Sequence, residues 1–224
     1  MTSTRPDTVA QSAAADHAQT FLDWTRVNSK LLTTGAVVVA VAAAGYWLYL
    51  RSSQIQAANA ERALLTAKQS MTAGNMPLAQ KDLQNVYAKY GSTSAGVQAA
   101  MLLAEIDYDA GKVQDGISIL QKVAGSSAAS GVESTILSLE GDGQAQLKKF
   151  AEAAKAYEDA ARATSFETEG SFHLAKAARA YEAGGNAAKA KEIWTKLLND
   201  PKAQTMSAEA RVRLGELSAT TAKR

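Results

Sequence analysis

Residues 178–198, ARAYEAGGNAAKAKEIWTKLL, contain the pattern on which the fold depends. A small residue, Ala178, is followed by Gly185-Asn186, by a second small residue, Ala190, and by a large one, Trp194. Glycine and asparagine tolerate the left-handed backbone conformation that ends many helices. The stretch therefore predicts two helices that are joined at Gly185-Asn186 and that cross closely at their small residues.

The same pattern recurs at a step of 37 residues. Small residues on the first helix of each pair are Ala67, Ala104, Gly141, Ala178 and Gly215. Small residues on the second helix are Ala79, Gly116, Ala153 and Ala190. Four residues after each of the second set lies a large side chain, in the order Leu83, Leu120, Tyr157 and Trp194. We expect these residues to pack a series of stacked helix pairs, each of which buries its apolar face only against its neighbours.

Turn signals follow the same step, at Gly74-Asn75, Gly111-Lys112, Lys148-Lys149 and Gly185-Asn186. The third turn lacks glycine and asparagine, so only the step predicts it. First helices are expected at 57–73, 94–110, 132–147 and 169–183, and second helices at 77–90, 113–123, 150–164 and 187–198. The predicted repeat units are 57–93, 94–130, 131–167 and 168–204. Residues 205–224 are the predicted cap, with a helix at 207–220 that covers the open end.

These features resemble the tetratricopeptide repeat (TPR), which has small residues at its eighth and twentieth positions and a turn between its two helices. Phe150 and Tyr181 fit aromatic positions of that pattern, and Pro201 lies near its closing proline. The usual step is about 34 residues, so we expect the extra residues in loops between pairs. The resemblance implies an all-α, TPR-like solenoid of about four helix pairs with a C-terminal capping helix. Such a solenoid offers an extended face to segments of other proteins.

Residues 31–50, LLTTGAVVVAVAAAGYWLYL, precede the repeats and carry no charge. As a helix they would span roughly 30 Å, which matches the hydrocarbon core of a bilayer. We predict a single transmembrane helix at 31–50, between a head at 1–30 and a TPR-like domain at 51–224. Residues expected at the membrane interface are Trp24, Lys30, Tyr46, Trp47, Tyr49 and Arg51. No proline or glycine separates the anchor from the first repeat, so one continuous helix is possible.

Two other interpretations of the apolar segment compete with an anchor. A helix buried in a protein core can be equally apolar. A cleaved signal peptide is the second alternative, because Ala42-Ala43-Ala44 resembles a cleavage site.

The head has two parts. Residues 1–15 are rich in Ser, Thr, Ala and Gln and are expected to be disordered. Phe21 and Trp24, followed by Arg26 and Lys30, predict either an amphipathic interfacial helix or the first turns of the transmembrane helix. Basic residues flank the anchor on both sides, so charge leaves both orientations open.

Composition excludes several kinds of site. The 224 residues include 24 basic and 22 acidic side chains and no cysteine. Disulfides, thiol catalysis and cysteine-based zinc sites are therefore excluded, and the absence of a basic stripe argues against nucleic acid. His17 and His173 would lie on opposite sides of the membrane and cannot share a metal, and His173 is expected to be structural or exposed. We expect a non-enzyme without cofactor, metal or small-molecule substrate.

Two patterns each allow two interpretations. An acidic cluster in the second pair consists of Glu105, Asp107, Asp109 and Asp115. It forms either a solvated face or a patch for a basic partner segment. Small residues four apart in the anchor are Ala36, Ala40 and Ala44. They form either a column that a second helix approaches or a chance product of an alanine-rich anchor.

The join of head, anchor and tail is similar to the ancillary SecYEG translocon subunit family, the YfgM-like inner-membrane proteins. The residues that carry this resemblance are Phe21, Trp24, Asn28, Lys30, Tyr46-Trp47 and Ala57-Ala58-Asn59-Ala60. It implies a single-pass protein of the bacterial inner membrane with a cytoplasmic N-terminus and a periplasmic TPR domain. The implied partners are the Sec translocon, periplasmic chaperones or secreted chains, besides membrane lipid. The predicted function is thus a bitopic adaptor, and the alternative is a membrane-tethered scaffold or assembly factor for another envelope complex.

Overall fold

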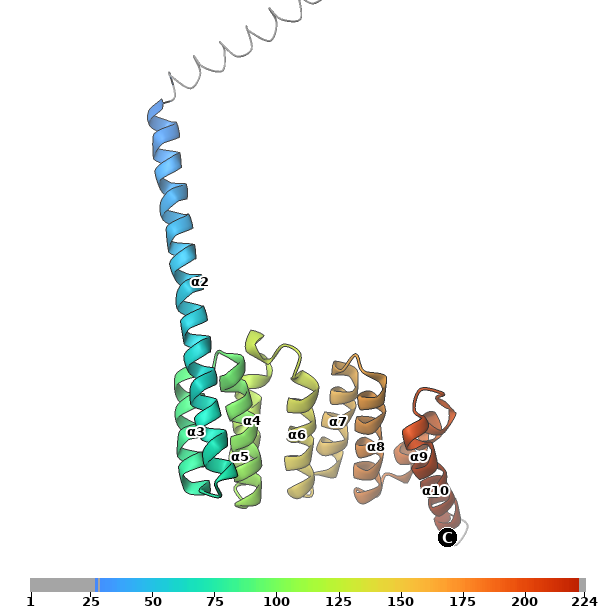
Figure 1. The fold of residues 1–224 in the computed structure, drawn as a ribbon. Coiled ribbons are helices and arrows are strands. Elements are labelled where there is room, and N and C mark those ends of the chain that lie inside the picture. The colour runs from blue at the N-terminus through green and yellow to red at the C-terminus, as the bar shows by residue number, and fades with distance from the viewer. Residues whose placement is uncertain (1–26, 28, 222–224) are drawn as a thin grey trace, which may run out of the picture. The chain divides into compact units, whose positions relative to one another are not determined.

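The computed structural model describes residue 27 and residues 29–221. These residues contain nine α-helices and one short 3-10 helix and no strand (Figure 1). The fold is therefore all-α, as the sequence predicted. The chain divides into two compact units that meet between Ile55 and Gln56, and each is described by itself.

Helix α2, Ser29–Thr72, contains the predicted anchor in its first half. It is long and apolar enough to cross a membrane, and none of the residues in its apolar window is buried. The interpretation as a buried core helix is therefore wrong, because no other part of the described chain covers this segment. The hydroxyls of Thr33 and Thr34 donate to the carbonyls of Ser29 and Lys30, at 2.7 and 2.8 Å. Both polar groups are thus satisfied within the helix, which is a condition that any membrane-spanning helix must meet.

The second unit consists of alternating first and second helices. After the end of α2, the first helices are α4 Ser94–Asp109, α6 Glu133–Gln146 and α8 Glu167–Ala183. The second helices are α3 Met76–Tyr90, α5 Val113–Ala124, α7 Phe150–Ala163 and α9 Ala187–Asn199. The 3-10 helix η1, Ser127–Ala129, precedes α6, and α10, Gln204–Thr221, packs on α9 and α8. Apart from the continuous start of α2, these bounds lie within three residues of the predicted ranges.

One type of turn joins the two helices of every pair. The second residue after each first helix has a positive φ, with values of 76° at Gly74, 75° at Gly111, 59° at Lys148 and 77° at Gly185. The next N–H then donates to the carbonyl five residues earlier; Lys149 N–H, for example, donates to Gln144 O at 2.9 Å. This is the Schellman arrangement, which satisfies the last carbonyls of a helix. The third turn adopts it without glycine, so the step of 37 residues located it correctly.

The two helices of a pair cross at their small residues. The eight small residues of the four pairs are all buried, namely Ala67, Ala79, Ala104, Gly116, Gly141, Ala153, Ala178 and Ala190. A Cβ atom at Gly141 would lie 2.5 Å from the ring of Tyr157 on α7. A Cβ atom at Gly116 would lie 2.6 Å from the ring of Tyr108 on α4. These crossings leave no room for a side chain.

Gly215 differs from the other small residues. It lies on α10, is exposed, and a Cβ atom there would have no neighbour within 4 Å. The prediction that Gly215 packs a helix pair is therefore wrong. The physical reason is that no second helix follows α10 among the described residues, so nothing crosses it at this point.

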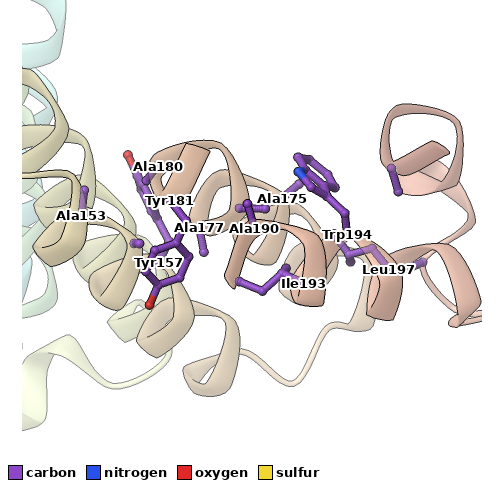
Figure 2. Close-up of a cluster of buried hydrophobic side chains, with 14 residues drawn as sticks. Ala153, Tyr157, Ala175, Ala177, Ala180, Tyr181, Ala190, Ile193, Trp194 and Leu197 are labelled. Carbon is purple, nitrogen blue, oxygen red and sulfur yellow. The ribbon is translucent and has the colours of Figure 1, made fainter. Parts of the chain in front are cut away.

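The core of the second unit consists of three apolar clusters. One lies between α2, α3 and α4 around Leu64 and Leu83, and the next joins α4, α5 and α6 around Ile117 and Leu120. The third joins α7, α8, α9 and α10 around Trp194, and Figure 2 shows its alanines and larger side chains. Each cluster is built by consecutive helices, as expected of a solenoid.

The turn at Lys148 predicts a stabilising substitution. A left-handed conformation costs a residue with a Cβ atom about 1–2 kcal/mol, whereas glycine loses about 0.5–1 kcal/mol through its freedom in the unfolded chain. We expect Lys148→Gly to stabilise the protein by about 0.5–1 kcal/mol and to raise Tm by about 2 °C, measured by circular dichroism. Lys155 lies at an exposed position inside α7, so Lys155→Gly is the control and should lower Tm through the poor helix propensity of glycine. An unchanged or lower Tm for Lys148→Gly would contradict the assignment of this turn.

A second prediction separates packed glycines from the exposed one. Gly141→Ala should destabilise the protein by about 1–3 kcal/mol, because the new methyl group overpacks the crossing against Tyr157. Gly215→Ala should instead stabilise it by about 0.5–1 kcal/mol through helix propensity. Urea unfolding midpoints of the two variants measure the difference. Equal effects at both positions would show that the close crossing at Gly141 does not exist.

Candidate protein-binding surface

Side chains of consecutive first helices contact one another directly, and we call the surface that they form the first-helix face. Lys68 of α2 donates to Gln98 of α4 at 3.2 Å. Tyr108 of α4 reaches α6, Asp142 of α6 pairs with Lys176 of α8, and Arg179 of α8 pairs with Glu209 of α10. The first-helix face therefore extends over the whole second unit, and hydrogen bonds and ion pairs connect each helix of this face to the next.

Tyr108 fills the space between α4 and α6. Its hydroxyl donates to the carbonyl of Leu139 at 3.1 Å, and its ring lies against two glycines, Gly116 and Gly143. A Cβ atom at Gly143 would lie 2.5 Å from the Tyr108 hydroxyl. Burial raises the pKa of Tyr108 well above its usual value. The side chain of Tyr108 is thus neutral and buried, and its ring fills the space between α4 and α6.

Lys176 is the centre of the contact between α6 and α8. Its Nζ lies 2.6 Å from Asp142 Oδ1 and donates to Ser138 Oγ at 3.0 Å. It also lies 4.6 Å from the ring centre of Tyr157, and the Tyr157 hydroxyl donates to Asp142 at 2.6 Å. Burial and this hydrogen bond raise the pKa of Tyr157. Phe172 completes the site with a ring that is 45% exposed, 5.9 Å from the same Nζ. An ammonium group between two rings and a carboxylate is held firmly.

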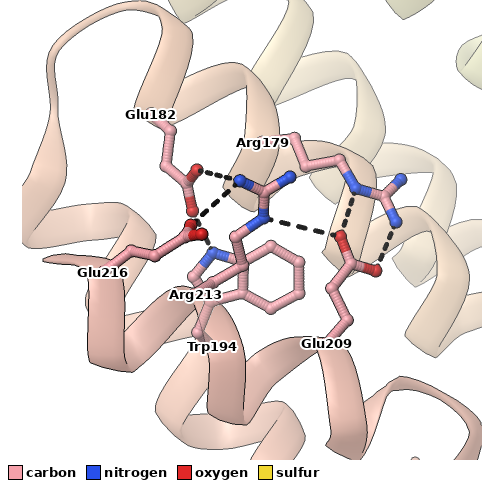
Figure 3. Close-up of polar contacts among 6 residues, drawn as sticks. All are labelled: Arg179, Glu182, Trp194, Glu209, Arg213 and Glu216. Carbon is pink, nitrogen blue, oxygen red and sulfur yellow. Dashed lines mark hydrogen bonds and ion pairs between the residues drawn. The ribbon is translucent and has the colours of Figure 1, made fainter.

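A cluster of two arginines and three glutamates attaches α10 to α8 and α9 (Figure 3). Arg179 binds Glu209 through both Nε and Nη2, at 2.7 and 2.5 Å. Arg213 lies 3.9 Å from both Glu182 and Glu209 and 3.2 Å from Glu216. The indole N–H of Trp194 donates to Glu182. The hydrogen bonds from Arg179 hold the pKa of the Glu209 carboxyl below its usual value.

A serine, a histidine and a glutamate meet between α6 and α8, but not in a catalytic geometry. Ser134 Oγ lies 2.9 Å and Glu169 Oε1 lies 3.3 Å from the same atom, Nε2 of His173. A serine–histidine–acid triad needs its two partners on opposite ring nitrogens. His173 is buried, which agrees with a structural role that pins α8 to α6. His17 lies outside the described residues.

The acidic cluster predicted in the second pair is split between two places. Asp107 is buried and accepts a hydrogen bond from the amide of Gln80 on α3 at 3.5 Å, and burial raises the pKa of its carboxyl in spite of the nearby charge of Lys112. Glu105 instead lies on the first-helix face. There, partial burial and the negative charges of Asp109 and Asp142 raise the pKa of its carboxyl. Glu105, Asp109 and Asp115 are exposed, as a solvated face requires, whereas Asp107 is buried and does not belong to that face. Within the described ranges, no group of three or more His, Asp or Glu side chains is placed to hold a metal.

The residues expected at the membrane interface lie on α2, apart from Trp24, which is outside the described residues. Tyr46, Trp47 and Tyr49 are 65%, 58% and 70% exposed. The guanidinium of Arg51 lies 5.6 Å from the ring centre of Trp47. The aromatic residues at the C-terminal end of the apolar segment are thus in contact with Arg51, the charged residue that ends this segment.

The residues that join first helices were not predicted as a site. A partial signal for them exists in the sequence, because the partners of three of these contacts stand 30 or 31 residues apart, although Asp142 and Lys176 do not. Lys68 and Gln98 show this separation, as do Arg179 and Glu209, and Tyr108 and Leu139.

Comparison with known proteins agrees with this architecture. The model of the tetratricopeptide repeat-like domain matches residues 23–137 and 62–173, so the chain belongs to this family of TPR proteins. A solved structure of nearly identical TPR-like repeats, from a protein described as a kinesin light chain of Podosopora anserina, is 17% identical with a TM-score of 0.52. The match covers 73% of this chain and 95% of that one. A variant form of the same protein gives 16% identity and a TM-score of 0.51, over 73% and 94% of the two chains. At this identity the likeness shows the fold alone, and no curated protein matches the chain.

The Arg179–Glu209 pair predicts a pH-dependent attachment of α10. Because the folded pKa of Glu209 is lowered from 4.5, the pair stabilises the fold above that value, and this contribution is lost as the pH falls through the lowered pKa. We expect Glu209→Gln to cost about 1 kcal/mol at pH 7, since both side chains are partly exposed. The cost should shrink as the pH falls below about 4, measured by urea midpoints. A cost that is independent of pH would refute this role of the carboxylate.

Proposed function

We propose that this protein is a membrane-tethered, non-enzymatic adaptor that binds other proteins through its first-helix face. TPR-like repeats generally mediate protein–protein contacts, and their helix pairs present an extended surface for polypeptide segments. The observation that carries the proposal is that such a repeat unit follows a helix that is long and apolar enough to span a bilayer and has no buried residue in its apolar window.

The proposed organisation has a head at 1–30, an anchor at 31–50 and a TPR domain at 51–224. Lys30, Tyr46, Trp47, Tyr49 and Arg51 then lie at the two membrane interfaces. Aromatic rings favour the headgroup layer and charges are costly in the hydrocarbon, which supports this placement.

We further propose that the anchor lies in a bacterial inner membrane, with the N-terminus in the cytoplasm and the TPR domain in the periplasm. The proposed partners are components of the Sec translocon, periplasmic chaperones or secreted chains. Support comes from the similarity of the head, anchor and first repeat to the YfgM-like family. A scaffold or assembly factor for another envelope complex is the alternative, because the repeat architecture suits either role.

One crosslinking experiment tests side and surface together. The chain has no cysteine, so a single introduced cysteine is unique. Glu105→Cys and Ala183→Cys place it at exposed positions of α4 and α8, and Lys122→Cys places it on the second helix α5 as the matched control. A membrane-impermeant maleimide–benzophenone reagent is added to intact spheroplasts. We expect labelling of all three variants, and crosslinked proteins at the first two positions only, identified by mass spectrometry.

Each result decides one part of the proposal. Labelling only after lysis would refute the orientation. Translocon subunits, chaperones or secreted chains as products would support the adaptor, whereas members of another envelope complex without them would favour the scaffold. The absence of crosslinked protein at both first-helix positions would refute a protein-binding role for this face.

A further inference from the structure

One position of the repeat is occupied differently in each unit. The step of 37 residues places Met71, Tyr108, Ala145 and Glu182 at the same point near the end of successive first helices. At this point a side chain can bridge to the next first helix. The four residues therefore show how each space between neighbouring first helices is filled.

Three of the four spaces are filled by the chain itself. Met71 packs against the apolar cluster of α2, α3 and α4. Tyr108 inserts between Gly116 and Gly143 and bonds to the carbonyl of Leu139. Glu182 accepts from Trp194 and pairs with Arg213 of α10. A long side chain at this position is thus the rule in this solenoid.

Ala145 leaves the third space open. A groove of about 250 Å³ lies there, between α6 and α8. Its walls include Phe150, Tyr157, Ala180 and Ala183, and Lys176 and Arg179 stand at its rim. Phe150 and Tyr157 occupy the positions of Val113 and Leu120 one unit earlier, so this space is lined by larger rings than the one that Tyr108 fills.

We propose that this groove binds an aromatic side chain, phenylalanine or tyrosine, of a partner protein. This inference rests on the proposed adaptor function and names the chemistry that its surface selects. The occupant is argued from the same molecule, because Tyr108 fills the equivalent space 37 residues earlier. The partner's ring would occupy the space that an aromatic side chain at position 145 would fill.

The groove suits a ring better than an aliphatic side chain. Its walls supply two aromatic rings for stacked or edge contacts, and the rim supplies two cations that attract a ring face. Lys176 already makes such contacts with Tyr157 and Phe172. A tyrosine hydroxyl would meet the carbonyl of Lys176, which stands where Leu139 stands for Tyr108. Ala180 replaces Gly143, so the partner ring lies less deep than Tyr108 does.

The two cations at the rim of the groove, Lys176 and Arg179, do not require an acidic residue in the partner. Lys176 is paired with Asp142 at 2.6 Å, and Arg179 is paired with Glu209 through two hydrogen bonds. Both cations thus keep their own carboxylates, and the ring is recognised without a neighbouring acid.

Binding is tested with the full-length protein in lipid nanodiscs. The probe is a short Gly-Ser peptide with one central 4-fluorophenylalanine, observed by fluorine NMR. We expect line broadening on addition of the protein, reversed by unlabelled peptides with central Phe or Tyr. A peptide with central Leu should compete about fivefold less well, and one with central Ala should not compete.

Filling the groove from inside provides the decisive variant. Ala145→Tyr copies the arrangement of Tyr108 and should weaken probe binding by about tenfold or more. Ala145→Met copies Met71 and serves if the tyrosine variant does not fold, which circular dichroism shows. Ala188→Tyr adds the same ring at an exposed site on α9 and should bind the probe as the wild type does.

Several results would overturn the proposal. They are the absence of broadening with wild type, equal competition by Leu and Phe peptides, and unchanged binding to folded Ala145 variants. Proteins crosslinked at Glu105→Cys, which lies outside the groove, regardless of Ala145→Tyr would refute the groove and leave the adaptor function intact, whichever result Ala183→Cys in the groove wall gives. The absence of any crosslinked protein at those positions would refute the adaptor function itself.

Discussion

The closeness of the helices within each pair is the constraint on which the rest of the second unit depends. At Gly116 and Gly141 the opposing rings lie where a Cβ atom would be, and at the alanine positions only a methyl group fits. Close packing makes even one additional carbon costly at such a point. The small residues therefore fix the distance between the helices, and the large residue one turn later fills the space that remains. Every pair repeats this geometry because no pair has a core of its own.

The backbone imposes the second half of the constraint. Each pair reverses direction through a left-handed residue at the same step, and the N–H groups that follow cap the preceding helix. Lys148 shows that the geometry prevails over local preference: tertiary packing holds a lysine in a conformation that glycine occupies elsewhere in the series. Local propensity is a weak preference, whereas the packing of whole helices involves many contacts.

Much of this architecture could be predicted because it depends on periodic properties. Small residues, turns and large side chains return every 37 residues, so helix bounds followed even where the third turn gave no signal. Gly215 was misjudged because a period continues past the last pair although the second helix does not. Asp107 departs from the acidic face predicted for Glu105, Asp109 and Asp115, because residues two apart on a helix point to different sides and Asp107 faces α3.

The polar contacts of the first-helix face were harder to foresee. Asp142, Lys176 and Arg179 are ordinary charged residues in sequence, and their pairing depends on how far one first helix is displaced along the next. How far one first helix is displaced along the next depends on how the helix pairs pack at their small residues, such as Gly141 and Ala178. The open space beside Ala145 is even less visible from sequence, since alanine is common in this chain and only comparison with Met71, Tyr108 and Glu182 shows that something is missing.

The division of the core into three clusters has a consequence for how this unit responds to load. Each cluster joins a few consecutive helices. Tyr87 and Ile119 pack against both the first and the second cluster, and the crossing of Gly141 on α6 with Tyr157 on α7 connects the second cluster to the third. A repeat unit of this kind opens in parts, because each helix pair packs only against its neighbours and each cluster involves only a few consecutive helices. A pull on one end would release helices one group at a time, and the remaining groups would keep their native packing. The unit would thus unfold in steps under tension, and each group of helices would refold against the native groups that remain once the tension is released.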